Sequence, residues 1–155
     1  MHLVYAIDHL GSGGAQRQVA ELAARLSARP GLRVSVLVYH PHDFFADRLL
    51  EAGVEIVRIP RRGRFDVAFP RRIARWYRHE RVDVVHAYLV APAFWHGLAI
   101  ATLPRGARPR WIAAERAGVL AATRASRIVE TAVYRRADAA TANARPMARA
   151  LTSVL

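Results

Sequence analysis

The chain has 155 residues, of which 53% are hydrophobic and 23% are charged. This length and composition predict one folded domain with its own core and exclude a disordered chain. Cysteine is absent, which excludes disulfide bonds and thiolate metal sites and is compatible with a reducing compartment.

The net charge of +12 is the unusual bulk property, and all 24 basic residues are arginine. Arginine binds phosphate groups in a bidentate manner, so anionic lipid surfaces, nucleic acids and phosphorylated ligands are all compatible partners. General use of alanine and arginine along the chain is the alternative explanation. Charge alone does not choose among them.

Apolar runs alternate with amphipathic runs, which predicts strands alternating with helices. The expected strands cover residues 3–7, 33–39, 54–59, 82–86, 111–114 and 139–142. A first helix ends before residue 29, and further helices are expected over 44–52, 70–80, 92–102, 121–137 and 146–155. This alternation predicts an α/β fold with a Rossmann-like, doubly wound parallel sheet of about six strands.

Punctuating residues and apolar spacing refine three of these helices. Gly53 is expected to terminate the second helix, and Pro70 to lie in the first turn of the third. The residues expected to face the core are Val19, Leu22, Ala23 and Leu26, then Ile73, Trp76 and Tyr77, then Ile128, Val129, Ala132 and Val133.

The first strand leads into a glycine-rich stretch, Asp8–Arg17, with glycine at positions 11, 13 and 14. Glycine allows a sharp turn that exposes backbone N–H groups, and the helix that follows contributes the positive end of its dipole. This geometry suits an anion, most often a phosphate. A plain tight turn into a helix is the alternative.

Two common phosphate-binding motifs do not fit this stretch. Gln16 stands where a dinucleotide motif has its third glycine, and the second strand ends at His40 without an acidic residue to hold a ribose. The absence of lysine excludes a Walker loop. The sequence therefore argues against both NAD and the usual P-loop.

Parallel α/β sheets bind ligands outside the carboxyl ends of their strands. The turns after the first, fourth and fifth expected strands carry Gly13 and Gly14, His86 and Tyr88, and Glu115 and Arg116. We expect these turns to form the site, with Asp8 and His9 as supporting residues. His96 lies inside an apolar helix, where a structural role is expected.

One stretch raises a membrane-spanning alternative. Residues 84–103 carry no formal charge and are long enough to cross a bilayer. Two histidines, Pro92 and a β-strand-like start favour a buried strand followed by a buried helix, which has the same composition.

Several motifs in order resemble the N-terminal domain of GT-B glycosyltransferases of the GT4 type. Gly13-Gly14-Ala15-Gln16-Arg17 is similar to the start of that domain. The segments that resemble its later motifs are Val82–Ala87 with Tyr88, Ala113–Arg116, Ala137-Asp138 and Thr141–Asn143. The likeness covers essentially the whole chain, although Glu115-Arg116 replaces a histidine that is frequent after the fifth strand.

The resemblance implies transfer of a sugar from a nucleotide sugar to a glycan or lipid-linked acceptor, in synthesis of surface polysaccharides or glycoconjugates. It implies retention at the anomeric carbon and no required metal or cofactor, since the nucleotide sugar is a substrate. A second domain with an E-x7-E motif would bind the donor. We expect residues 1–155 to be a single acceptor-side domain that lacks this second domain and is inactive alone.

The resemblance also suggests what individual residues do. Gly13, Gly14, Gln16 and Arg17 would approach the donor phosphates. The residues on the acceptor side would be His86, Tyr88, Glu115 and Arg116. For Gln16 and Arg17 the alternative is solvation of the first helical turn. For Glu115 and Arg116 the alternative is a surface ion pair. No paired carboxylates, metal cluster or Ser/His/Asp set indicates independent catalytic machinery.

Arginines are dense in residues 61–78, where they alternate with Phe65, Phe69 and Trp76. A solvated face is the default interpretation. Arginines interleaved with aromatic residues also suit an anionic membrane surface, for which the candidates are Arg61, Arg62, Arg64, Arg72 and Arg75. We expect a cytoplasmic protein that is peripheral on the inner face of the cell membrane.

Two other classes of function stay open. One is a stand-alone binding or regulatory half-domain, which would fold alone and pair with a separate donor domain. The other is a basic α/β domain that binds nucleic acid, with steep salt dependence. No helix-turn-helix or RNP pattern supports a nucleic-acid partner, so we do not expect one.

Overall fold

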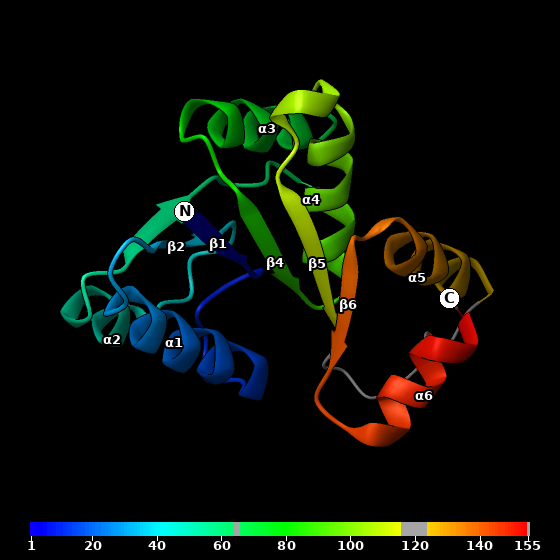
Figure 1. Ribbon diagram of the computed structural model, residues 1–155, viewed down its shortest axis with the longest axis horizontal. Helices are drawn as coiled ribbons and strands as arrows, with labels where there is room; N and C mark the ends of the chain where they lie inside the picture. Colours follow the sequence, from blue (N-terminus) through cyan, green and yellow to red (C-terminus); the bar gives the residue numbers. More distant parts are fainter. Residues whose placement is uncertain (64–65, 116–123, 155) are drawn as a thin grey trace.

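Six short parallel strands form one sheet in the order β3-β2-β1-β4-β5-β6, in a computed structural model that describes residues 1–63, 66–115 and 124–154 (Figure 1). The strands are β1 His2–Ala6, β2 Arg33–Val38, β3 Glu55–Arg58, β4 Val84–Tyr88, β5 Arg110–Glu115 and β6 Ala139–Ala142. The register pairs Leu3 of β1 with Val34 on one side and Val84 on the other. The predicted doubly wound α/β fold is confirmed.

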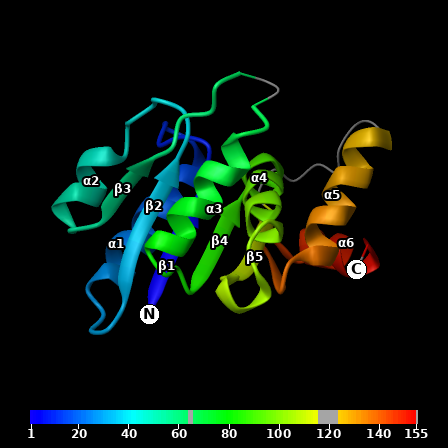
Figure 2. The same ribbon diagram turned by 90° about the horizontal axis from the view of Figure 1, so that it is seen from above.

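Helices cover both faces of the sheet. They are α1 Gly14–Ser27, α2 Ala46–Glu51, α3 Phe69–His79, α4 Val90–Ala101, α5 Arg124–Arg136 and α6 Arg145–Val154, with a short 3-10 turn at Arg105–Ala107. Figure 1 shows α1 and α2 below the sheet and α3 and α4 above it, and Figure 2 shows α3 and α4 side by side.

Side-chain alternation along β1 creates the two halves of the core. Leu3 and Tyr5 pack with α1 and α2, whereas Val4 and Ala6 pack with α3 and α4. Each predicted element is present, with bounds that shift by a few residues. Gly53 follows α2 with φ of 70°, and Pro70 lies in the first turn of α3, as expected.

The predicted inward faces are corrected at three positions. Leu22 is exposed, whereas Trp76 is partly buried and packs against the core as expected. On α5 the side chains of Ile128 and Val129 are exposed at 64% and 38%. Val133 is buried as predicted, and Glu130 and Tyr134 complete the buried face of α5. The Tyr134 hydroxyl reaches a carboxylate beneath the helix.

The uncharged stretch at residues 84–103 divides into β4 and α4. In the parts of the chain that the structure describes, no helix is long and apolar enough to cross a membrane. The interpretation as a buried strand followed by a buried helix is confirmed.

Candidate functional site

The strand order reverses between β1 and β4, and ligands of open α/β sheets bind at the carboxyl edge of such a point. The glycine-rich turn follows β1 there. Gly13 is the N-cap of α1 with extended backbone, and no side chain caps the helix. The first helical hydrogen bond runs from Arg17 N–H to Gly13 O at 2.9 Å.

The uncapped N-terminus of α1 makes the turn a source of hydrogen-bond donors and positive potential. The N–H groups of the first turn have no partner inside a helix, and they carry the positive end of the dipole. Neither Asp nor Glu lies in the first turn of α1, and the Arg17 side chain is exposed beside it. The arrangement favours an anion.

Gln16 holds the turn from inside. Its side chain is buried, and Nε2 donates to Asp8 Oδ1 at 3.4 Å. A Cβ placed on Gly13 would lie 2.1 Å from Gln16 Oε1, so a larger residue there would displace the Gln16 side chain. At Gly14 an added Cβ would meet nothing within 4 Å. The Gln16 side chain therefore packs inside the turn. The alternative of a solvated first-turn side chain is wrong for Gln16.

A histidine brace supports the turn. Gly11 N–H donates to His9 Nδ1 at 2.9 Å, and His9 N–H donates to Asp8 Oδ1 at 2.9 Å. The His9 ring meets the His42 ring edge-on, with centroids 5.1 Å apart. Leu10 N–H also donates to His42 O at 2.7 Å. Sequence reasoning missed His42, although a histidine two residues after His40 was visible beyond the second strand.

On β4 the predicted strand end is corrected, because the strand continues to Tyr88 and His86 lies within it. His86 is half-buried on the α1 side of the sheet, with its ring 5.5 Å from that of Tyr5 and 4.7 Å from that of Tyr88. Its Nε2 lies 3.3 Å from Thr141 Oγ1 of β6. Tyr88 itself is fully buried.

Glu115 ends β5 and is 1% exposed, so its carboxylate lies inside the protein rather than on the surface. Tyr134 of α5 donates its hydroxyl to Glu115 Oε2 at 2.5 Å. Burial, followed by this hydrogen bond, raises the pKa of Tyr134 above its ordinary value. The bond joins β5 to α5. Arg116 lies outside the described residues.

Of the predicted membrane arginines, two contact partners within the protein and two have exposed side chains. Arg72 pairs with Asp66 at 2.6 Å and donates to Pro60 O at 2.8 Å. Arg61 stacks over the Trp95 ring at 4.7 Å. Arg62 and Arg75 have exposed side chains. Arg64 and Phe65 lie outside the described residues.

His96 has the structural role that was expected. It is completely buried in α4, and its Nδ1 contacts the hydroxyl of Tyr77 from α3. Burial lowers the pKa of His96 to about 3 and raises that of Tyr77. Over residues 1–63, 66–115 and 124–154, no group of three or more His, Asp or Glu could hold a metal.

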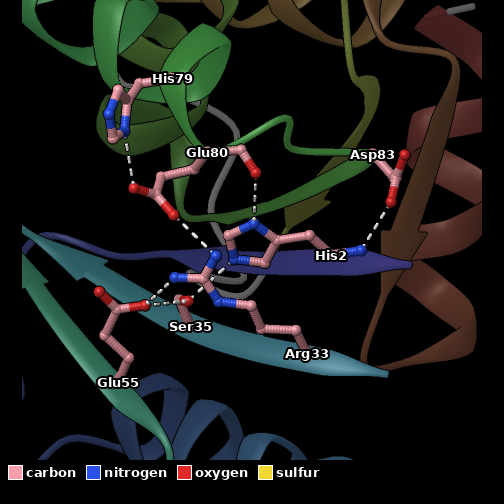
Figure 3. Close-up of polar contacts among 7 residues, drawn as sticks. All are labelled: His2, Arg33, Ser35, Glu55, His79, Glu80 and Asp83. Carbon is pink, nitrogen blue, oxygen red and sulfur yellow. Dashed lines mark hydrogen bonds and ion pairs between the residues drawn. The ribbon is translucent and has the colours of Figure 1, made fainter. Parts of the chain in front are cut away.

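A separate polar network lies at the opposite, amino edge of the sheet. Figure 3 shows its members, which are His2, Arg33, Ser35, Glu55, His79, Glu80 and Asp83. Arg33 pairs with Glu55 at 2.8 Å and with Glu80 at 2.7 Å. Ser35 donates to Glu55 at 3.0 Å and lies 2.9 Å from His2 Nε2.

This network contains a serine, a histidine and a glutamate, but it is not a nucleophilic site. The glutamate binds the serine rather than orienting the histidine, which is the reverse of the catalytic arrangement. Ser35 is also fully buried. The network fastens the starts of β1, β2 and β3 to the end of α3.

The fold and the glycine turn together define a class: a doubly wound α/β domain with an uncapped helix N-terminus at its topological switch point. A sequence model described as the glycosyl transferase 4-like domain matches residues 13–155, so the chain belongs to this family. The predicted likeness to the N-terminal domain of GT4-type glycosyltransferases is confirmed. No curated protein matches the chain.

Solved structures show the same fold. The Anabaena protein Alr3699/HepE in complex with UDP is 12% identical, with a TM-score of 0.78 over 99% of this chain and 41% of its own. The same protein with UDP and glucose gives 0.77 at 13% identity, over 98% and 40%. A glycosyltransferase from Rickettsia africae ESF-5 gives 0.72 at 17% identity, over 97% and 38%. The chain thus spans about two fifths of these proteins' length.

Proposed function

We propose that the chain forms the acceptor-side half of a glycosyltransferase, which moves a sugar from a nucleotide sugar to a glycan or lipid-linked acceptor. The observation that carries this is the uncapped N-terminus of α1 behind Gly13, at the switch point of a family member's sheet. UDP in the solved Anabaena protein supports a nucleotide-sugar donor. Synthesis of surface polysaccharide or glycoconjugate is the setting we infer.

The chemistry asked of this turn is charge stabilisation. Negative charge grows on the departing diphosphate as the bond to the sugar breaks, and pre-oriented N–H donors stabilise it at no reorganisation cost. The amides of the first turn of α1 and the exposed Arg17 provide such donors. A donor domain beyond these residues would bind the nucleotide, so residues 1–155 alone would be inactive. The donor is a substrate, and no cofactor is required.

The acceptor would approach along the strands beside the turn. His86 is half-buried there and already contacts Thr141, so its ring is held in one orientation. Tyr88 packs behind it, and Glu115 acts through Tyr134 rather than on the ligand. We infer that His86 contacts the acceptor, while Tyr88 and Glu115 are positioning residues.

We also infer that the protein works on the cytoplasmic side of a membrane, where a lipid-linked acceptor would be available. Exposed arginines near α3, such as Arg62 and Arg75, support attraction to anionic lipids. Arg61 and Arg72 would instead stabilise the loop before α3, through Trp95 and Asp66.

The test uses the product of the complete reading frame that contains these residues. It is incubated with labelled nucleotide sugars and a lipid extract, and sugar transfer is counted. Gly13→Ala displaces the Gln16 side chain and should lower kcat/KM about 10- to 100-fold. Gly106→Ala, where an added Cβ meets nothing within 4 Å, is the matched control. Equal activity of the two variants, or no transfer by the wild type, would refute the proposal.

A further inference from the structure

Three arginines form one stripe on the outer face of α3. Arg71, Arg75 and Arg78 are spaced at i, i+4 and i+7, and all three are exposed. With a rise of about 1.5 Å per residue, the stripe extends over about 10 Å. Their side chains and the C-terminal end of α4, at Thr102–Pro104, line a hollow of about 280 Å³.

Four exposed arginines outside the stripe have a carboxylate partner among the described residues. Arg33, Arg48, Arg58 and Arg110 each pair with a carboxylate at 2.7–3.5 Å. Within the described ranges, no carboxylate lies within ion-pair distance of the three arginines of the stripe. Like charges at these spacings destabilise a helix. The fold therefore keeps a row of mutually repelling cations without any internal anion.

A second hollow continues the positive surface. Arg78 also lines a hollow of about 340 Å³, together with Arg81 and Arg108. The Arg108 guanidinium is already fixed, because Nε donates to Leu103 O at 2.8 Å and Nη2 donates to Ala101 O at 3.1 Å. Asp83 also lines this second hollow, and its Oδ2 accepts from His2 N–H at 2.6 Å.

The polar groups of the first hollow select for an anion. Thr102 donates its hydroxyl to Ala99 O at 2.7 Å, which leaves only oxygen lone pairs for a ligand. The donors that face the hollow are therefore guanidinium groups, and these match phosphate oxygens in pairs. The negative C-terminal end of the α4 dipole would also attract these arginines to the hollow. This attraction provides no anion to pair with their guanidinium charges.

We propose that this α3–α4 surface is a phosphate-binding site separate from the glycine turn. It lies on the opposite face of the sheet from α1, next to the amino edge where α3 and α4 end (Figures 1 and 2). Its ligand carries phosphate groups in a row, either as a free polyphosphate anion or as the headgroups of an anionic bilayer. The inference rests on the proposed function only where the phosphate belongs to a membrane lipid.

The experiment compares two triple variants of the chain. Arg71→Gln/Arg75→Gln/Arg78→Gln removes the stripe, and Arg25→Gln/Arg29→Gln/Arg149→Gln removes the same charge from exposed arginines elsewhere. Both are titrated with inorganic pyrophosphate by calorimetry and with vesicles of phosphatidylglycerol and phosphatidylcholine by flotation. Circular dichroism checks that each variant folds. The assay needs no sugar transfer, so its failure and that of the proposed function are distinguishable.

We expect the stripe variant to lose on the order of 100-fold in binding, and the control variant to stay within about threefold of the wild type. Loss of pyrophosphate binding identifies the free anion as the ligand, and loss of vesicle binding alone identifies lipid headgroups. Equal loss in both variants, or no binding of either probe by the wild type, would overturn the proposal. Preference for a DNA duplex over both probes would overturn it in favour of a nucleic-acid surface.

Discussion

The buried pair between Tyr77 and His96 makes folding stability dependent on pH. The two side chains join α3 to α4 in the upper half of the core, and both are completely buried. Burial lowers the pKa of His96 to about 3, so the folded protein holds a neutral imidazole. The Tyr77 hydroxyl and His96 Nδ1 share one hydrogen bond, in which the donor is set by the imidazole tautomer. No hydrogen-bond partner for Nε2 exists in the described part of the chain.

The sign follows from comparing the folded and unfolded chains. In the unfolded chain His96 has an ordinary pKa near 6.5, so below that pH the unfolded state binds a proton that the folded state rejects. Stability is complete above about pH 6.5 and falls as the pH drops toward 3. At about 1.4 kcal/mol per pH unit, this residue alone lowers the unfolding free energy by about 3 kcal/mol between pH 7.5 and 4.5.

The assay is urea unfolding followed by tryptophan fluorescence at both pH values. His96→Gln removes the titrating group but keeps a side-chain amide that can hydrogen-bond the Tyr77 hydroxyl, so its loss of stability over this range should be smaller by about 3 kcal/mol. His40→Gln, at an exposed histidine, controls for the change in residue type. If wild type and His96→Gln lose the same free energy between the two pH values, the account of His96 is wrong.

Two further predictions concern the stability of the loop before α3 and the packing of α4. Hydrogen bonds from Arg72 and from a backbone N–H lower the pKa of Asp66 to about 2, so this carboxylate stabilises the fold above about pH 4 and the effect is lost toward pH 2. Asp66→Asn should therefore lower the thermal midpoint at pH 7 and show a weaker acid dependence in calorimetry. Gly97→Ala would place a Cβ 2.4 Å from the Trp111 ring and should cost about 1–3 kcal/mol in urea unfolding. Gly106→Ala should stay near wild type, and an unchanged Gly97→Ala midpoint would contradict this packing.

Local patterns in the sequence were sufficient to predict the sheet and its helices. The strands β2 and β4 lie in fully parallel surroundings, so both are rich in apolar residues, with Ser35 and His86 as polar interruptions. Gly53 and Pro70 act within one turn of their own position, which is why their effect is readable without a structure. The parallel order then brings the glycine turn, β4 and β5 to a common edge.

Contacts between distant elements were not readable in this way. The apolar spacing of α5 predicted Ile128 inside, but Glu115 lies under this helix and draws Tyr134 inward. His86 was expected at a strand end, and only the pairing of β4 with β5 through Tyr88 places it within the strand. The fit of Gln16 against Gly13 also depends on the folded turn.

The distribution of acids explains how a strongly basic chain keeps distinct anion sites. The chain has 12 acidic residues and 24 arginines, so there are too few carboxylates to pair with every guanidinium. At the amino edge Glu55 and Glu80 both bind Arg33, and before α3 Asp66 binds Arg72, so these arginines serve the fold. At the glycine turn Asp8 accepts from His9 and Gln16, within the turn itself. Asp8 is therefore engaged by groups of the turn, and the stripe on α3 has no carboxylate within ion-pair distance among the described residues. These two places are where we propose that external anions bind.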